Sequence, residues 1–172
     1  MRSRRLLMPI TVLAAVALTG CSDNAGENSS HARGSEGEIG AITVQNAYLV
    51  PALVPGTCII QYEAPAELAF TATNNALEPD RLIAIESPAA ASVQLQATAE
   101  QLAIPADGAL AAGQPVAQPE RPGSEEPITV QVNQLQDWVE PGRHLDIRFT
   151  FDRAGTLELA VPVDSCPTQQ SP

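Results

Sequence analysis

Lysine does not occur in this sequence of 172 residues, and nine arginines are its only permanently cationic side chains. The sequence also has twenty acidic residues, so its formal net charge is −11. Affinity for nucleic acid depends on cationic contacts with phosphate, and attraction to anionic lipid headgroups depends on basic clusters. The composition therefore argues against a nucleic-acid partner and against direct binding of the folded chain to anionic lipid.

Histidine and methionine are also scarce, with only His31 and His144, and Met1 and Met8. Nucleophilic catalysis needs a base beside a serine or cysteine. The sequence contains no Gly-x-Ser-x-Gly elbow, phosphate-binding glycine-rich loop or zinc-ligand spacing. A pair of carboxylates could still form an acid–base site, because carboxylates are plentiful. We expect a protein that is not an enzyme and that uses no cofactor.

The first 20 residues have the features of an export signal. Three arginines precede an apolar run over residues 6–18, and this run is shorter than the ~20 residues that a membrane-spanning helix needs. A charged start, a short apolar stretch and small residues before a cleavage point are typical of secretory signals. We therefore expect residues 1–20 to be removed with three arginines and both methionines. Six arginines and twenty acidic residues then remain, for a net charge of −14.

The residues at the end of this segment, Leu18-Thr19-Gly20-Cys21, resemble the lipobox of bacterial lipoproteins. In that motif the cysteine thiol accepts a diacylglyceryl group, and the small residues before it give the signal peptidase access to the bond. The resemblance implies that Cys21 is lipidated and that the protein is held on the extracytoplasmic face of the cell membrane. The alternative is a plain secretory signal with an incidental cysteine.

A polar segment follows Cys21 and is rich in serine, glycine, asparagine and glutamate. Such a composition buries too little apolar surface to offset the entropy of ordering the chain. We therefore expect residues 21–40 to form a flexible tether, in which His31 is a spacer residue rather than a metal ligand. Residues 41–166 are long enough for one domain with one core, and residues 167–172 are expected to be a disordered tail.

Two further cysteines, Cys58 and Cys166, lie in the expected domain. An even pair in an exported chain, where oxidation is normal, predicts a disulfide. The bridge would join an early loop to the C-terminal end of the domain. The alternative is two free thiols that bind a metal.

The domain shows the period-two alternation of half-buried strands. Over residues 144–151, Leu145, Ile147, Phe149 and Phe151 share one face, and the next turn has Gly155 where a positive φ is needed. Similar runs, separated by proline and glycine, occupy residues 42–48, 67–72, 81–86, 92–96, 128–132 and 156–163. About seven strands predict an all-β fold, an antiparallel β-sandwich, although the alanine-rich residues 89–91 and 97–103 could form a short helix.

The order of several segments resembles that of a known family. They are residues 42–48 (ITVQNAY), 85–90 (IESPAA), 92–95 (SVQL), 104–108 (IPADG), 135–142 (LQDWVEPG) and 147–157 (IRFTFDRAGTL). As an ordered set they are similar to the PCu(A)C periplasmic copper chaperones and, more closely, to the LpqE-type lipoproteins of actinobacteria. The resemblance spans roughly residues 42–163 and implies a cupredoxin-like or immunoglobulin-like β-sandwich.

The same resemblance implies where copper ligands would lie, and the residues found there differ from the family's. PCu(A)C chaperones hold Cu(I) with histidine and methionine, and soft sulfur ligands suit that ion. The family's first histidine position falls at about Gln96, and its His-x-Met pair falls at about Thr129 and Gln131. His144 is on the polar face of its expected strand and reads as a surface residue. No metal ligand can be carried over to this chain.

Two hypotheses follow for the function. In the first, the protein is a membrane-anchored lipoprotein whose domain is a non-enzymatic binding or structural module for an unidentified envelope protein. In the second, it is a copper chaperone with a non-standard site, formed by the thiols of Cys58 and Cys166 with His144. The redox state of the cysteines distinguishes the two, because a disulfide removes the thiolates that the second hypothesis requires.

Overall fold

A computed structural model describes residues 34–113 and 127–165 of the chain. The expected signal peptide, the expected lipidation site at Cys21, the expected tether as far as residue 33, Cys166 and the expected tail over 167–172 all lie outside the described residues. Within the described ranges, no helix has the length and apolar character needed to cross a membrane.

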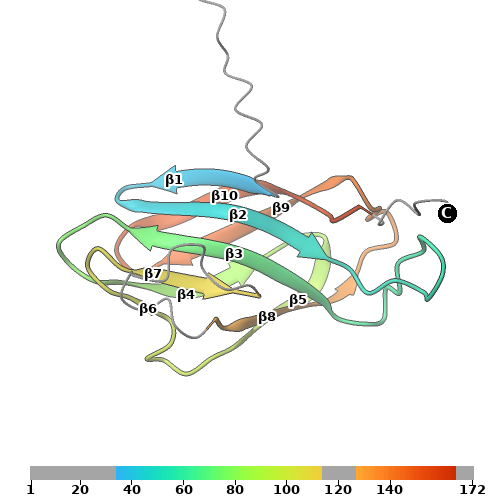
Figure 1. The fold of residues 1–172 in the computed structure, drawn as a ribbon, viewed down its shortest axis with the longest axis horizontal. Coiled ribbons are helices and arrows are strands. Elements are labelled where there is room, and N and C mark those ends of the chain that lie inside the picture. The colour runs from blue at the N-terminus through green and yellow to red at the C-terminus, as the bar shows by residue number, and fades with distance from the viewer. Residues whose placement is uncertain (1–33, 114–126, 166–172) are drawn as a thin grey trace, which may run out of the picture. The chain divides into compact units, whose positions relative to one another are not determined.

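Ten strands and no helix make up the described secondary structure, and they form two antiparallel sheets (Figure 1). The first sheet has the order β1-β2-β3-β8-β5, with β7 also paired to β3, and the second has the order β10-β9-β4-β6. The predicted all-β sandwich is therefore confirmed. The strands are β1 (Ser35–Ile39), β2 (Ile42–Val50), β3 (Ala66–Asn74), β4 (Asp80–Glu86), β5 (Ala90–Gln96), β6 (Ala103–Ile104), β7 (Ala109–Ala112), β8 (Thr129–Leu135), β9 (His144–Phe151) and β10 (Gly155–Pro162).

The core lies between the two sheets, where the apolar side of each strand is buried. In β9 the burial alternates residue by residue, with Leu145, Ile147, Phe149 and Phe151 inside, as the sequence predicts. Across the sandwich, Phe149 meets Phe70 of β3 edge to face, with ring centroids 5.1 Å apart. Aromatic pairs of this geometry add about 0.5–1.5 kcal/mol to the free energy gained from burial alone.

The two sheets are joined along one border of the sandwich. Ser35 at the start of β1 donates its hydroxyl to the carbonyl of Ala160 in β10, at 2.5 Å. Leu49 forms an isolated parallel bridge with Val163, and the amide of Asp164 donates to the carbonyl of Leu49 at 2.7 Å. At the other border β5 ends the first sheet and β6 ends the second, and these two strands are not paired with each other.

The structure differs from the expectation in the number of strands and in where the first strand begins. The folded chain has ten strands rather than about seven, and β1 occupies residues that the composition assigned to the tether. β1 has the polar sequence Ser-Glu-Gly-Glu-Ile and lies at a sheet edge. It is held as a strand by its pairing with β2, which the composition of the segment does not predict. β7 is buried at all four residues, so it shows no alternation. Residues 98–102 form a turn, closed by a hydrogen bond from the Leu102 amide to the Thr98 carbonyl, and not a helix.

A buried carboxylate organises the turn between β9 and β10. Asp80, only 9% exposed, accepts hydrogen bonds from the backbone amides of Arg153 at 3.0 Å and Ala154 at 2.9 Å. Its Oδ1 also accepts one from the amide of Arg81 at 2.7 Å. Gly155, the next residue of the turn, has the positive φ that the sequence predicted, at 95°. Asp80 thus fixes the β9–β10 hairpin to the start of β4 through the oxygens of its side chain.

We expect Asp80→Ala to lower the free energy of unfolding by about 2–3 kcal/mol, because hydrogen bonds to a charged acceptor are worth about 1.5–3 kcal/mol and the substitution leaves backbone amides without a partner. Thermal or urea unfolding followed by circular dichroism measures the change. Asp152→Ala, at an exposed position of the same turn, is the matched control and should change the free energy of unfolding by no more than about 0.5 kcal/mol. Equal effects of the two substitutions would contradict the assigned role of Asp80.

Candidate functional site

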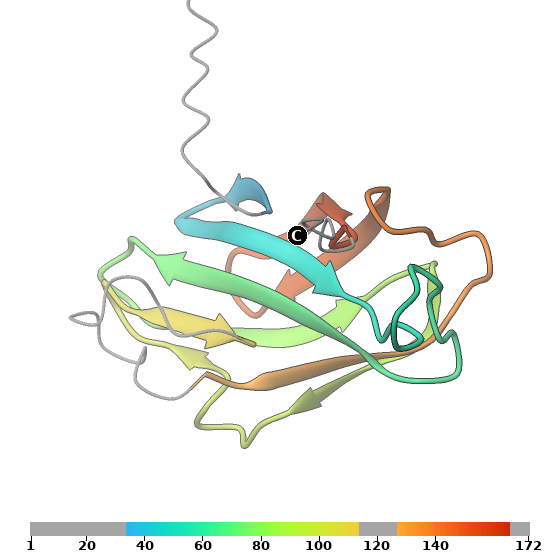
Figure 2. The same ribbon diagram turned by 45° about the vertical axis from the view of Figure 1, so that its right-hand side comes forward.

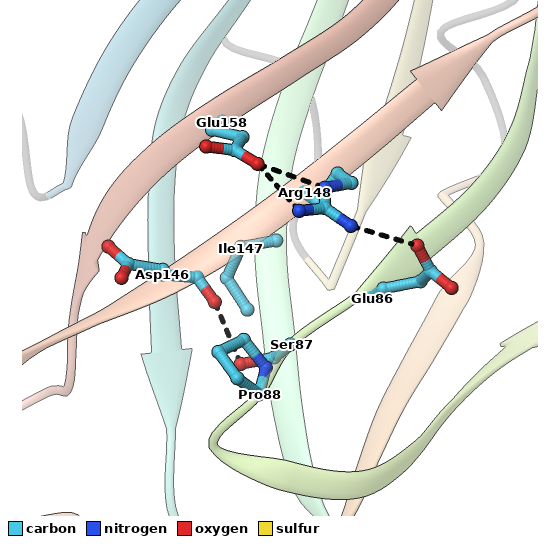
Figure 3. Close-up of a pocket in the computed structure, with 7 residues that line it drawn as sticks. All are labelled: Glu86, Ser87, Pro88, Asp146, Ile147, Arg148 and Glu158. Carbon is cyan, nitrogen blue, oxygen red and sulfur yellow. Dashed lines mark hydrogen bonds and ion pairs between the residues drawn. The ribbon is translucent and has the colours of Figure 1, made fainter.

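A groove of about 430 Å³ crosses the exposed side of the second sheet (Figure 3). Its lining residues come from the end of β4, the turn after it, β9 and the middle of β10, and they are Glu86, Ser87, Pro88, Asp146, Ile147, Arg148 and Glu158. The strand register places Arg148 directly opposite Glu86 on one side and Glu158 on the other. Three adjacent strands therefore bring one cation between two carboxylates.

Arg148 is held firmly by these neighbours. Its guanidinium donates to Glu158 Oε1 from Nε at 3.0 Å and from Nη2 at 2.7 Å, and its Nη1 lies 3.7 Å from a carboxylate oxygen of Glu86. The hydrogen bond to Glu158 is the largest cause of the raised pKa of Arg148, and the charge of Glu158 adds to it. Because both carboxylates flank the guanidinium, an incoming anion would meet negative charge on either side of it.

A second polar side chain of the groove, that of Ser87, also bonds within the fold. The hydroxyl of Ser87 donates to the backbone carbonyl of Asp146 at 2.8 Å, which fastens the β4–β5 turn to β9. In this arrangement the hydroxyl of Ser87 donates to a backbone carbonyl and not to a side-chain base. Sequence reasoning missed this cluster, because alternation marks Arg148 as outward-facing but does not reveal which residues stand opposite it.

A second surface lies on the first sheet, at the adjacent strands β5 and β8. Its exposed and half-exposed side chains carry amides and hydroxyls and no charge, and we call it the amide face. Its members are Ser92, Gln94 and Gln96 of β5 and Thr129, Gln131 and Asn133 of β8. The register pairs Gln96 with Thr129, Gln94 with Gln131 and Ser92 with Asn133. Glu67 of β3 follows on the far side of Gln131.

The amide face contains all three positions at which the family resemblance places copper ligands. Gln96 is the direct register partner of Thr129, and Gln131 lies two residues further along the same side of β8. Directly opposed residues have Cβ atoms about 4.5–5.5 Å apart, so these positions converge in space as ligand positions must. The side chains present are neutral amides and a hydroxyl, which are hard donors and suit Cu(I) poorly.

The residues of the alternative, cysteine-based site are only partly described. Cys58 lies at the exposed tip of a hairpin over residues 52–61, which is closed by the amide of Val54 donating to the carbonyl of Ile59 at 2.8 Å. His144 begins β9, is exposed, and stands opposite Pro162. Cys166 lies outside the described residues, so neither the disulfide nor a thiolate site is tested. Among the residues that are described, no group of three or more His, Cys, Asp or Glu side chains could hold a metal ion.

Comparisons with known proteins agree with this geometry. The family model "Putative lipoprotein LpqE-like" matches residues 42–163, and no curated protein sequence matches the chain. Among solved structures, the "Copper-bound PCuAC domain from PmoF2" aligns with a TM-score of 0.55 at 23% identity, over 77% of this chain and 99% of that chain. The "Apo PCuAC domain from PmoF1" aligns with a TM-score of 0.57 at 19% identity, over 77% of this chain and 100% of that chain. At these identities the likeness establishes a shared fold.

The predicted Cys58–Cys166 disulfide can be tested on native material. The chain after β10 returns to the end of β2, where Asp164 contacts Leu49, and β2 leads into the hairpin that carries Cys58. We therefore expect non-reducing peptide mapping to find the two cysteines in one linked peptide pair. Reduction should lower the free energy of unfolding by at most about 4–5 kcal/mol, the chain-entropy value for a loop of ~100 residues. Alkylation of both thiols without a reductant would contradict the prediction.

Proposed function

Because the chain belongs to the LpqE-like family, we propose that it is a lipid-anchored extracytoplasmic protein whose sandwich domain is a non-enzymatic binding module and not a copper carrier of the PCu(A)C kind. The lipid would be attached at Cys21 and the partner would be a protein of the cell envelope. A family described as lipoproteins and a lipobox-like sequence at residues 18–21 support the anchoring from independent directions.

The observation that carries the argument against copper is the chemistry of the amide face. Fold and function separate easily, because function depends on the side chains of a site and not on the scaffold. A copper-bound structure of the same fold exists in the PCuAC domain from PmoF2, so the scaffold is compatible with copper. In this chain the matching positions hold Gln96, Thr129 and Gln131, and the two histidines are elsewhere. The amides of Gln96 and Gln131 and the hydroxyl of Thr129 would give weak uptake of Cu(I) at most.

A binding role is supported by the contrast between the two outer surfaces. In the groove of the second sheet the charge of Arg148 is balanced by Glu158 and Glu86. The amide face instead presents donors and acceptors without charge, and its residues make no ion pair with the rest of the described chain. Uncharged amides and hydroxyls can pair with a neutral protein surface at a small cost of desolvation compared with charged groups.

The alternative function is a copper chaperone that uses Cys58 and Cys166 thiolates with His144. Cys58 and His144 both lie on exposed segments of the domain, which is the observation in its favour. Thiolate is a good ligand for Cu(I), but only if the two cysteines are reduced, so the alternative and the disulfide exclude each other.

Lipid anchoring predicts the behaviour of Cys21→Ser. Without the thiol the diacylglyceryl group cannot be attached, so the protein should appear in the medium or accumulate as an unprocessed precursor. Fractionation of cells with detection of the chain by immunoblot makes the comparison, and Ser22→Ala is the matched control that should leave the protein on the membrane. Normal processing and full membrane retention of Cys21→Ser would refute anchoring at this residue.

The copper prediction is that the oxidised chain binds Cu(I) weakly or not at all. A competition titration against a Cu(I) chelator measures the affinity, and a one-to-one complex with a sub-nanomolar dissociation constant, corresponding to more than about 12 kcal/mol, would restore the chaperone as the leading function. Tight binding that appears only after reduction and disappears in Cys58→Ser would favour the cysteine site.

Two triple variants of the amide face sharpen this titration. Replacing Gln96 and Thr129 by His and Gln131 by Met places imidazole and thioether ligands at converging positions, so this variant should bind Cu(I) far more tightly than the natural chain. Replacing the same three residues by Ala should leave the weak uptake unchanged. A large loss of affinity in the Ala variant would mean that the amide face itself holds the metal.

A further inference from the structure

One end of the sandwich exposes most of the large apolar side chains that the fold leaves uncovered. Six such side chains are exposed among the described residues, and four of them lie in or beside the β2–β3 loop and the β8–β9 loop. These four, which we call the apolar end, are Val50, Val54, Ile59 and Trp138. An exposed apolar group of this kind is typical of a surface that binds a protein or a membrane.

The two loops of the apolar end are held against each other. Tyr62 of the β2–β3 loop donates its hydroxyl to the backbone carbonyl of Val139 in the β8–β9 loop, at 3.2 Å. Within the β2–β3 loop, Leu53 forms an antiparallel bridge with Ile60. Figure 2 shows both loops leaving the sheets at the right-hand end of the molecule. The exposed apolar side chains are therefore presented together by one braced surface.

Charge distinguishes this end from the opposite one. Residues 39–62, which include β2 and most of the β2–β3 loop, contain no charged side chain. At the opposite end Glu78 and Arg153 form an ion pair, Asp152 is exposed, and Leu77 lies beside these charges in the same turn as Glu78. Transfer out of water is costly for charged groups and favourable for apolar ones. The apolar end is thus the better suited of the two to a partner without water.

The N-terminal segment enters the domain at a fixed point close to the apolar end. The first residue of β1, Ser35, pairs with Ala47 near the end of β2, so β1 runs away from the apolar end. Gly34 packs tightly on β2, because a Cβ atom there would lie 2.7 Å from the carbonyl oxygen of Ala47. Cys21 precedes Gly34 by 13 residues, which span at most about 45 Å.

We propose that the apolar end rests on the lipid bilayer, with Trp138 and Ile59 at the level of the headgroups. The inference rests on the proposed lipid anchoring at Cys21. The anchor selects the occupant, because it keeps a bilayer within reach of the domain, and the exposed side chains select the end. A weak contact suffices, since tethering raises the local concentration of the domain at the bilayer and stable membrane attachment combines two signals.

The residues of the β8–β9 loop suit the headgroup level. Tryptophan is enriched there because its ring is apolar and its N–H can stay bonded to a polar group, and Trp138 is 56% exposed. Asp137 and Glu140 lie in the same loop, and Arg143 pairs with Glu140 at 3.4 Å. Charged groups are expensive in the hydrocarbon layer, so they keep the contact shallow. The two carboxylates also favour neutral headgroups over anionic ones.

Trp138 is the one tryptophan of the chain, so its fluorescence reports on this contact. The full chain is reconstituted in phosphatidylcholine vesicles with and without brominated phosphatidylcholine, which quenches tryptophan by contact. We expect the brominated lipid to lower the emission of Trp138 at least twofold more than that of a probe at the opposite end, Leu77→Trp in a Trp138→Phe chain. Leu77 is 95% exposed, so the probe leaves the core intact. Equal quenching at the two positions would overturn the proposal.

Flotation of the same vesicles on a density gradient separates this proposal from the anchoring. A chain that floats without quenching at Trp138 retains the anchor and overturns the contact with the bilayer. A chain that does not float has no anchor, and both proposals are then wrong. Acrylamide, a quencher dissolved in water, detects a different occupant. If Trp138 is shielded from acrylamide and is not quenched by the brominated lipid, a protein covers it, which again overturns the proposal.

A charged substitution tests the contribution of Ile59. Ile59 is 61% exposed, so Ile59→Asp leaves the core intact and opposes contact with lipid. Quenching of Trp138 by the brominated lipid should fall at least twofold, while flotation stays unchanged. Leu77→Asp, at the opposite end, is the matched control and should leave the quenching as it is. Circular dichroism verifies that both variants fold. Full quenching of Trp138 in folded Ile59→Asp would contradict the assigned contact.

Discussion

The whole domain depends on burying one apolar face of each sheet against the other. Phe70 of β3 and Phe149 of β9 meet at the centre of this contact, but phenylalanine is rare, with three in the chain. Most of the buried residues are branched aliphatic residues and alanine, such as Ile42, Leu68, Leu82 and Ala112. Small side chains allow close approach of the sheets, and they leave the outer faces free to differ in chemistry.

The outer faces differ because each is built from the residues that alternation directs away from the core. On the second sheet, ion pairs join three strands, because Arg148 lies between Glu86 and Glu158 and pairs with both. On the first sheet, β5 and β8 expose amides and hydroxyls. The positions that hold histidine and methionine in the PCu(A)C pattern are part of this neutral surface. A scaffold shared with a copper-bound domain therefore presents a surface whose groups suit neutral hydrogen bonding.

The two borders of the sandwich differ as well. At one border β1 and β10 are tied by the hydrogen bond from Ser35 to Ala160 and by the bridge between Leu49 and Val163. At the other border β5 and β6 remain apart. Sandwiches always have sheet edges, and only full closure removes them. In the described residues, β1 lies against β10 at one border, and β5 ends the first sheet at the other.

Alternation along the chain was sufficient to predict most strands and the sandwich. In a half-buried strand every second residue is apolar and faces the core, as from Leu145 to Phe151, so the pattern is visible in the sequence of the strand alone. The ordered segments from residue 42 to residue 163 were sufficient to identify the family. Strands without a local signal were missed: β1 is polar and β7 is buried on both sides. The roles of Asp80 and Arg148, the convergence of Gln96 with Thr129, and the position of β5 at a sheet border were decided by tertiary structure. Each depends on which strand lies beside which and in what register, and such pairing joins residues far apart in sequence that local patterns cannot connect.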